Sequence, residues 1–224
     1  IGTNETRTNG TVGFTPRTKR VIENAFMEAR KLLNALLVAE RLKDATRHCY
    51  TSGGRHESVA EHASFTFVID EVSRALLAQI TRHRMASFSV QSQRYCGVEP
   101  EWIVPPKFRE LGLEQEYIED CNRAYDKYCS YIEHGAEEED ARYVIPQGVT
   151  CRMGLTMNAR ELRHFFSLRC CERAQWEIRQ LAEEMLRLCK GVAPMLFADA
   201  GAGCVRGKCP EGAKSCGNPR RKEG

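Results

Sequence analysis

The sequence lacks any apolar run long enough to cross a membrane, which takes about 20 consecutive, mostly apolar residues. Residues 1–20 include basic side chains but no apolar block of the kind that forms a secretory signal. We therefore expect a cytoplasmic protein with no membrane partner.

A strong net charge is also missing from most of the chain. The formal charge is +3, but residues 204–224 hold six basic and two acidic side chains. Without them, 27 basic residues face 28 acidic ones, a net charge of −1. Attraction of the whole protein to nucleic acid is therefore not expected, and any anion site must be local.

Cysteine is abundant, yet its pattern does not predict a disulfide framework. The count of eleven is odd and the spacings are irregular, which favours reduced cysteines in a cytosolic protein. Cys204, Cys209 and Cys216 could bind a metal with a fourth ligand elsewhere, but their spacing is not a recognised zinc pattern. We favour a flexible C-terminal extension over residues 204–224, and no metal.

The pattern of apolar residues predicts a mixed fold. Apolar side chains recur at helical spacing over 16–45 and 107–134, whereas 65–70 alternate and 149–157 form a second plausible strand. A chain of 224 residues most often forms one domain. We expect one α+β domain with more helix than strand, preceded by a flexible lead-in at residues 1–14.

Local sequence signals predict where several elements begin and end. From about Glu71, a helical stripe is expected to run into residues 82–84, followed by a polar, Ser-rich segment. Asn158 is expected to cap a helix that runs through Arg169, and Glu161 at the third helical position suggests a capping box.

Another helix is expected over about 171–190, with Gly191 closing it. Within this helix we expect Trp176 to belong to the core and its polar neighbours Gln175 and Glu177 to form a rim around it.

The triplet Arg82-His83-Arg84 has the clearest chemical content. Successive helical residues are about 100° apart, so three such side chains present donors in several directions, which suits a polyanion such as a nucleotide. Arg is the preferred bidentate partner of phosphate. The alternative is a solvated helix end whose cations complement the helix dipole. Further donors follow at Ser87, Ser89, Ser92 and Arg94.

The spacing from Arg82 to Ser92 resembles the signature of the flavin-dependent thymidylate synthases, which is Arg-His-Arg, seven residues and then Ser. The continuation Gln93-Arg94-Tyr95 is also similar to that family. Three further blocks resemble the family in the same order, and the resemblance covers about residues 55–200; the blocks are 56–67, 141–146 and 158–178.

His56 and His62, with Glu57 and Glu61 between them, raise the possibility of a zinc site. The zincin pattern needs His where this chain has Ala60. We therefore interpret these residues as loop and cap positions.

The resemblance implies a fold in which long helices pack a small, mostly antiparallel sheet, here as one domain over residues 15–203. It implies methylation of dUMP to dTMP by an enzyme that uses FAD, with methylene-tetrahydrofolate as carbon donor and NADPH as reductant. Members of the family resemble one another in forming homotetramers whose active sites take residues from several subunits. The protein's part is to position the flavin and tune its surroundings.

The resemblance also implies site residues, position by position. Arg169 is the expected catalytic residue, because it matches the position thought to favour ionisation of the uracil N3 edge. Arg94 and Arg142 would neutralise the substrate phosphate. The full FAD set is Ser58, Arg82, His83, Arg84, Asn158, Arg160 and His164. The full dUMP set is Gln79, Arg82, Ser92, Gln93, Arg94, Arg142 and Arg169.

Three positions depart from the family pattern. Val90 stands where Glu or Gln is common, His164 replaces a commoner Asn, and Arg173 replaces a commoner His. Two rival functions stay open at this point. One is a non-catalytic nucleotide- or RNA-binding module, which the lack of interleaved stacking aromatics disfavours. The other is a different flavoenzyme on the same scaffold.

Overall fold

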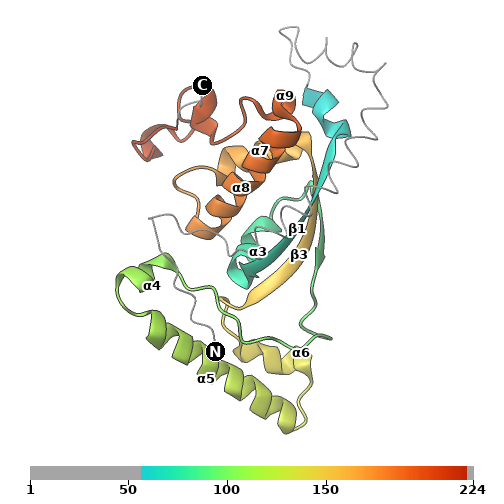
Figure 1. The fold of residues 1–224 in the computed structure, drawn as a ribbon, viewed down its shortest axis with the longest axis vertical. Helices are drawn as coiled ribbons and strands as arrows, with labels where there is room; N and C mark the ends of the chain where they lie inside the picture. The colour runs from blue at the N-terminus through green and yellow to red at the C-terminus, as the bar shows by residue number, and fades with distance from the viewer. Residues whose placement is uncertain (1–56, 221–224) are drawn as a thin grey trace.

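A three-stranded antiparallel sheet runs through the computed structural model, which describes residues 57–220 (Figure 1). The strands are β1 (Ser64–Ser73), β2 (Ala86–Val90) and β3 (Thr150–Asn158), in the order β1-β3-β2. The expected α+β class is confirmed. The helix expected over 16–45 and the lead-in lie outside the described residues.

Strand β1 confirms the expected alternation and then continues further than expected. Phe65, Phe67 and Ile69 are buried on one face. The register shifts between Ile69 and Val72, and Glu71 adopts a φ of 54°. This is a β-bulge, in which one extra residue bends the strand. Because pairing resumes after the bulge, the expected start of the helix at Glu71 is wrong.

Helix α3 (Arg74–Ile80) begins directly after the strand, with Ser73 as its N-cap. The Ser73 hydroxyl accepts a hydrogen bond from the Leu76 N–H at 3.0 Å, which satisfies one of the free donors of the first turn. The helix ends at Ile80, so Arg82-His83-Arg84 lie in the turn after it rather than on it.

Strand β2 was not expected, because the segment was interpreted as polar and Ser-rich. Its small serines stand on the exposed face at Ser87 and Ser89, while Ala86, Phe88 and Val90 pack against the core. The alternation is regular, but the hydroxyl side chains concealed it as a strand pattern.

The helices α4 (Pro106–Glu110) and α5 (Glu114–Glu133) replace the continuous helical face expected over 107–134. Gly112 separates them with a φ of 70°, a left-handed conformation that favours glycine. The short helices α6 (Glu138–Ala141) and η2 (Arg142–Val144) follow. Figure 1 shows α5 and α6 at one end of the sheet and α7 to α9 at the other.

Helix α7 (Ala159–Arg169) has the expected bounds and the expected cap. The Asn158 side chain accepts a hydrogen bond from the Glu161 N–H at 2.9 Å. Since β3 ends at Asn158, the sheet delivers this cap directly to the helix. The helix packs against the 3-10 helix η1 (Glu57–His62) and against α8 (Trp176–Val192).

Helix α8 corrects the expected helix over 171–190. The Gln175 side chain caps it by accepting hydrogen bonds from two backbone N–H groups, and Gly191 lies inside it rather than closing it. Ala193 ends α8, and α9 (Pro194–Phe197) begins with proline. No helix within residues 57–220 combines the length and apolarity needed to cross a membrane.

Glu177 overturns the expectation of a polar rim around a core tryptophan. Trp176 is half-buried, whereas Glu177 is buried, with 5% exposure. Its carboxylate accepts hydrogen bonds from the Ser73 N–H at 2.7 Å and the Ser73 hydroxyl at 2.5 Å. Burial raises the pKa of this carboxyl, and the two bonds from Ser73 oppose that change. Glu177 thus ties α8 to the start of α3.

The C-terminal segment folds back towards the turn between α7 and α8. The 3-10 helix η3 (Gly203–Arg206) contacts α7, and the Arg220 Nε donates to the Glu172 carboxylate at 2.9 Å. The ten cysteines of the described part are free. Within that part, no group of His, Cys, Asp and Glu side chains is arranged to hold a metal.

Replacing Glu177 with alanine is expected to lower the free energy of unfolding by about 1–3 kcal/mol, because two buried donors of Ser73 lose their acceptor. Denaturant unfolding followed by circular dichroism measures the change. The matched control is Glu110→Ala, an exposed glutamate on α4, for which a change within about 0.5 kcal/mol is expected. Equal effects of the two substitutions would contradict the role of Glu177.

Candidate functional site

The turn after α3 separates its three charged or titratable side chains. His83 is buried, with 6% exposure, while Arg82 and Arg84 are exposed. The His83 N–H donates to the Ile80 carbonyl at 3.1 Å, so the end of the helix directs this residue inward. The sequence analysis expected the triplet to spread its donors by helical spacing; the structure instead has it in a turn, with His83 buried and both arginines exposed.

Both ring nitrogens of His83 are engaged by α7. Nδ1 lies 3.1 Å from the Glu161 carboxylate, and Nε2 lies 3.1 Å from the Nε of Arg169. Because the guanidinium can only donate, Nε2 must accept, and Nδ1 then carries the proton that is donated to Glu161. The geometry therefore requires a neutral imidazole.

The electrostatics of His83 and Arg169 agree with that protonation state. Burial lowers the pKa of His83 from its ordinary value of 6.5; the hydrogen bond to Glu161 opposes this, and the charge of Arg169 adds to it. Burial also lowers the pKa of Arg169, and the charge of Arg82 adds to that effect. A guanidinium stays charged even so.

Arg169 also connects the site to α3. One of its Nη groups lies 3.5 Å from the Gln79 carbonyl. The Gln79 side chain donates to the Ala75 carbonyl at 3.4 Å within its own helix. The structure thus brings together the expected residues Gln79, His83 and Arg169, which come from two helices and the turn after α3.

A pocket of about 420 Å³ opens at the start of α7. Its lining includes three of the residues expected to contact the flavin, Asn158, Arg160 and His164. Arg160 forms ion pairs with Glu57 and Glu61 of η1. Arg84 is not among the lining residues, although its neighbour Met85 is. The other lining residues are Glu57, Glu61, Glu161, Arg163, Ser167 and Arg206.

Ser58 lies exposed on η1, between the two glutamates that pair with Arg160. The N-terminus of α7 offers fewer free backbone N–H groups than a helix N-terminus without capping contacts. The Ala159 N–H donates to the Ala63 carbonyl at 2.7 Å, and the Glu161 N–H donates to Asn158. Anion binding here would therefore depend mainly on side chains.

A second group of expected residues gathers beyond the other end of β2. Gln93 and Arg142 line a pocket of about 280 Å³. The Arg94 Nε donates to the Glu139 carboxylate at 2.5 Å, and the Ser92 hydroxyl accepts from the Arg94 N–H at 3.1 Å. Four of the expected substrate residues thus lie on two neighbouring segments, over 92–94 and at 142.

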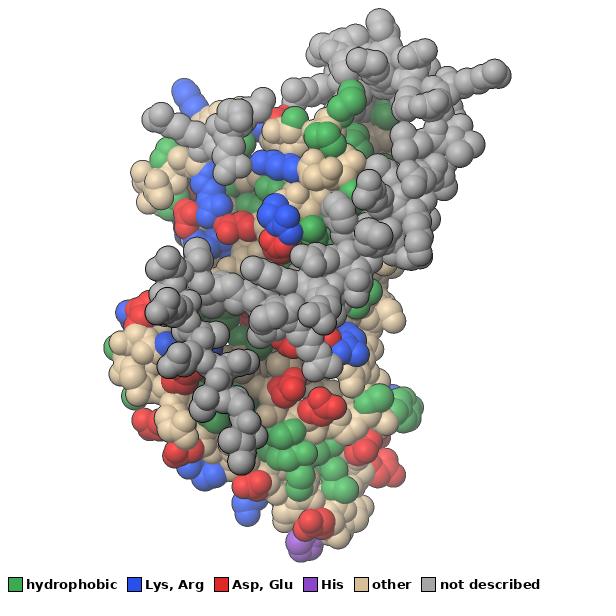
Figure 2. Space-filling view, in the orientation of Figure 1, with side chains coloured by type: hydrophobic (Ala, Val, Ile, Leu, Met, Phe, Trp, Pro, Cys, Tyr) green, Lys and Arg blue, Asp and Glu red, His purple; other side chains and the backbone are tan. Residues whose placement is uncertain are grey.

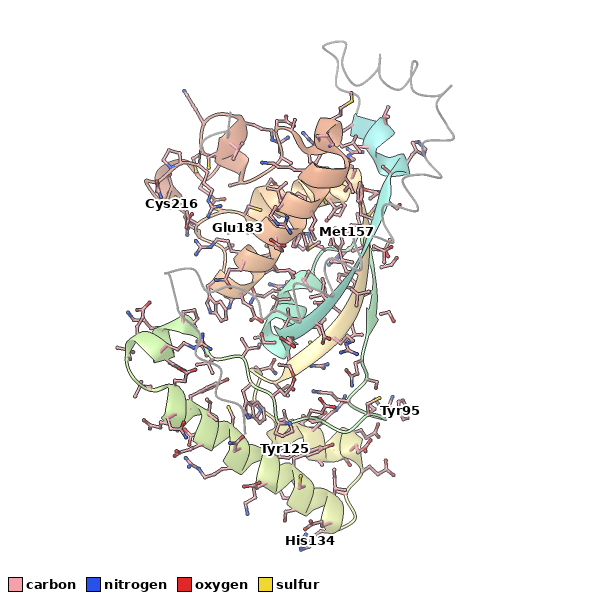
Figure 3. The ribbon with its side chains drawn as sticks, in the orientation of Figure 1. Tyr95, Tyr125, His134, Met157, Glu183 and Cys216 are labelled. Carbon is pink, nitrogen blue, oxygen red and sulfur yellow. The ribbon has the colours of Figure 1, made fainter. Side chains whose placement is uncertain are left out.

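The two groups are well separated within one chain. Met85 lines the first pocket directly before β2, and Gln93 lines the second shortly after it. Five strand residues span about 17 Å. In Figure 3, Met157 marks the first end of the sheet and Tyr95 the second. Figure 2 shows acidic side chains over the part of this face where α5 and α6 lie.

The three departures from the family pattern have different surroundings. The His164 ring lies 6.2 Å from that of His83 and lines the first pocket. Val90 packs against the core. Arg173 pairs with Glu211 and donates to a backbone carbonyl of the C-terminal segment, that of Lys214, so it lies with that segment.

Sequence reasoning missed the acidic partners of the site. Glu161 was expected to complete a capping box, but its carboxylate contacts His83 instead. Glu139 was not singled out, because it stands in a run of acidic residues that reads as a solvated surface. A carboxylate among arginines carries no distinctive sequence spacing, so this pairing is visible only in three dimensions.

Comparison with known proteins agrees with the geometry. A family described as "Thymidylate synthase complementing protein" matches residues 14–195. A flavin-dependent thymidylate synthase of Geobacter sulfurreducens is 52% identical over 166 residues, which cover 72% of this chain and 72% of the relative. One of Clostridium tetani is 42% identical over 229 residues, covering 91% of this chain and 90% of the relative. The chain therefore belongs to the flavin-dependent thymidylate synthase family.

Proposed function

We propose that this chain methylates dUMP to dTMP, with methylene-tetrahydrofolate as carbon donor, NADPH as reductant and FAD as cofactor. The observation that carries the proposal is the contact between His83 and Arg169. It joins the Arg-His-Arg turn, where the family resemblance is strongest, to the residue expected to act on the uracil ring.

The residues around the first pocket fit an anionic, extended cofactor such as FAD. Within residues 57–220, Arg82 and Arg84 have no ion-pair partner, and both are exposed. The two exposed guanidinium groups stand in the turn that leads to Met85, which lines the pocket of about 420 Å³, and they suit a diphosphate with the adjoining sugar chain. Asn158, Arg160 and His164 would contact the cofactor from α7, and Ser58 from η1. Bound FAD supplies the hydride carrier of the reaction.

The second group of residues suits the phosphate of dUMP. Arg94 and Arg142 carry fixed charges, and Gln93 lies in the same pocket as Arg142. Ser92 would add a hydroxyl donor, and Arg82 and Gln79 would contact the nucleotide nearer to the flavin. A local cluster of this kind explains how a chain of near-neutral charge binds an anion.

Arg169 is proposed as the catalytic residue. His83 fixes its Nε, so the rest of the guanidinium is aimed rather than free to rotate. A positive charge held in a partly water-excluded site stabilises negative charge that develops on the uracil ring far more than the same charge does in water. Neutral His83 orients Arg169 without adding a second charge.

The active site is proposed to form between subunits of a homotetramer. In one chain the two groups of residues lie at opposite ends of β2, and dUMP must meet the flavin. We place the enzyme in the cytoplasm and propose no nucleic-acid or membrane partner, which the near-neutral charge supports. We also propose a catalytic domain at 15–203, most of which falls within the family match over 14–195.

The purified protein, loaded with FAD, is expected to form dTMP from dUMP, methylene-tetrahydrofolate and NADPH, measured by chromatography of the nucleotides. Flavin absorbance of the protein as purified distinguishes a flavoenzyme from a nucleotide- or RNA-binding module. A flavin-loaded sample that oxidises NADPH but forms no dTMP would favour a different flavoenzyme and contradict the proposal.

Replacing Arg169 with alanine is expected to lower turnover by about 100-fold or more, as does removal of one preorganised electrostatic contact elsewhere. Flavin content should stay close to that of the unmodified protein, measured by absorbance after purification. The comparison variant is Arg160→Ala, in the first pocket, which should lose flavin first. Parallel loss of flavin and turnover in Arg169→Ala would count against its catalytic role.

A further inference from the structure

Glu139 bonds to two of the arginines proposed to bind the substrate phosphate. The Arg94 Nε donates to its side-chain carboxylate at 2.5 Å, and the Arg142 Nε donates to its backbone carbonyl at 3.0 Å. A single residue of α6 therefore engages the same atom, Nε, on two separate guanidinium groups.

The terminal nitrogens of both guanidinium groups have no partner among the residues that the structure describes. Among the residues at 57–220, the Nη atoms of Arg94 and Arg142 make no hydrogen bond. A guanidinium held at Nε still has its two Nη groups for another ligand, and their planar edge matches the oxygens of a phosphate. The centre of the Tyr95 ring lies 5.4 Å from the Arg94 Cζ, and this contact also restricts Arg94.

Glu139 differs in this respect from the acidic residues beside it. Residues 137–140 are all acidic, yet within the described structure Glu139 is the member whose side chain pairs with an arginine of this group. A run of four carboxylates next to a phosphate site repels the ligand unless some of its charge is neutralised. The contact with Arg94 neutralises the carboxylate that lies nearest to the two arginines.

We propose that Glu139 is a positioning residue for the phosphate of dUMP: it holds Arg94 by its side chain and Arg142 by its carbonyl, and both contacts are made at Nε rather than at the Nη groups. This inference rests on the proposed function. It makes Glu139 a determinant of the preference for the nucleotide over the nucleoside, because its effect passes through the arginines proposed to bind the phosphate.

In the opposite role, Glu139 would mask the arginines and compete with the phosphate. Its removal would then strengthen dUMP binding rather than weaken it. A competing carboxylate would occupy the Nη edge, where a phosphate docks. The contact at Nε leaves that edge open, which favours positioning. The pair is also half-exposed, with side-chain exposures of 50% and 37%, so its loss should not unfold the protein.

The test compares Glu139→Ala with Asp140→Ala in the FAD-loaded protein. Asp140 is an exposed acid on the same helix, so the control has the same change of charge. Isothermal titration measures the affinity for dUMP and for deoxyuridine, which lacks the phosphate. We expect Glu139→Ala to weaken dUMP binding by about tenfold, the usual scale of one charge-assisted contact. Deoxyuridine binding and the control should be unchanged.

Two further variants separate failure of this inference from failure of the proposed function. Glu139→Gln keeps an acceptor for the Arg94 Nε and should recover part of the lost affinity. Arg94→Ala should weaken dUMP binding by itself, and adding Glu139→Ala to it should then have little further effect.

Unchanged or tighter dUMP binding by Glu139→Ala, with Arg94→Ala impaired, would overturn the positioning role and leave the phosphate site standing. Equal loss of dUMP and deoxyuridine affinity would also overturn it, since that pattern indicates general damage. If Arg94→Ala binds dUMP normally, the proposed phosphate site fails, and this inference fails with it.

Discussion

The hydrogen bonds of the buried His83 ring fix the relation between the turn after α3 and helix α7, and the candidate site depends on that relation. Near the start of the helix, the Glu161 carboxylate accepts a hydrogen bond from one ring nitrogen. At the end of the helix, Arg169 donates a hydrogen bond to the other. The two partners are eight residues apart in sequence, so α7 is attached to the turn near both of its ends. Arg82 and Arg84, the exposed residues on either side of His83, are thereby held in place.

This arrangement requires a neutral imidazole. A protonated His83 would have no lone pair for the Arg169 Nε–H and would place a second positive charge beside it. Burial lowers the pKa of His83 in the folded protein, so the network contributes its stability above the ordinary value of 6.5. That stability is lost as the pH falls from 6.5 through the lower folded pKa. The same contact that orients Arg169 thus makes the site sensitive to acid.

Several parts of the fold follow from sequence because they depend on local chemistry. The cap at Asn158 and the alternation over 65–70 need information from only a few neighbouring residues, and both agree with the structure. The bulge at Glu71 could not be expected, because it depends on pairing with a strand about 80 residues away. The same holds for Glu177, whose burial depends on Ser73, 104 residues earlier.

The site divides in a similar way. The arginine and histidine positions were expected from the motif that carries the family resemblance, but their acidic partners were not. Glu161 and Glu139 act through contacts formed by folding, across 78 and 45 residues of sequence, and no spacing rule marks them. The separation of the two groups along β2 also became visible only with the structure. It is the physical reason for proposing a site shared between subunits.

The central claim is that neutral His83, protonated on Nδ1, orients Arg169. Nitrogen-15 NMR of the histidine side chains at pH 7, with His83 assigned by comparison with His83→Gln, reads the tautomer directly. The account predicts a proton on Nδ1, a bare Nε2, and a titration midpoint below 6.5. A proton on Nε2, or a ring charged at pH 7, would contradict the account, because Arg169 could then not donate to it.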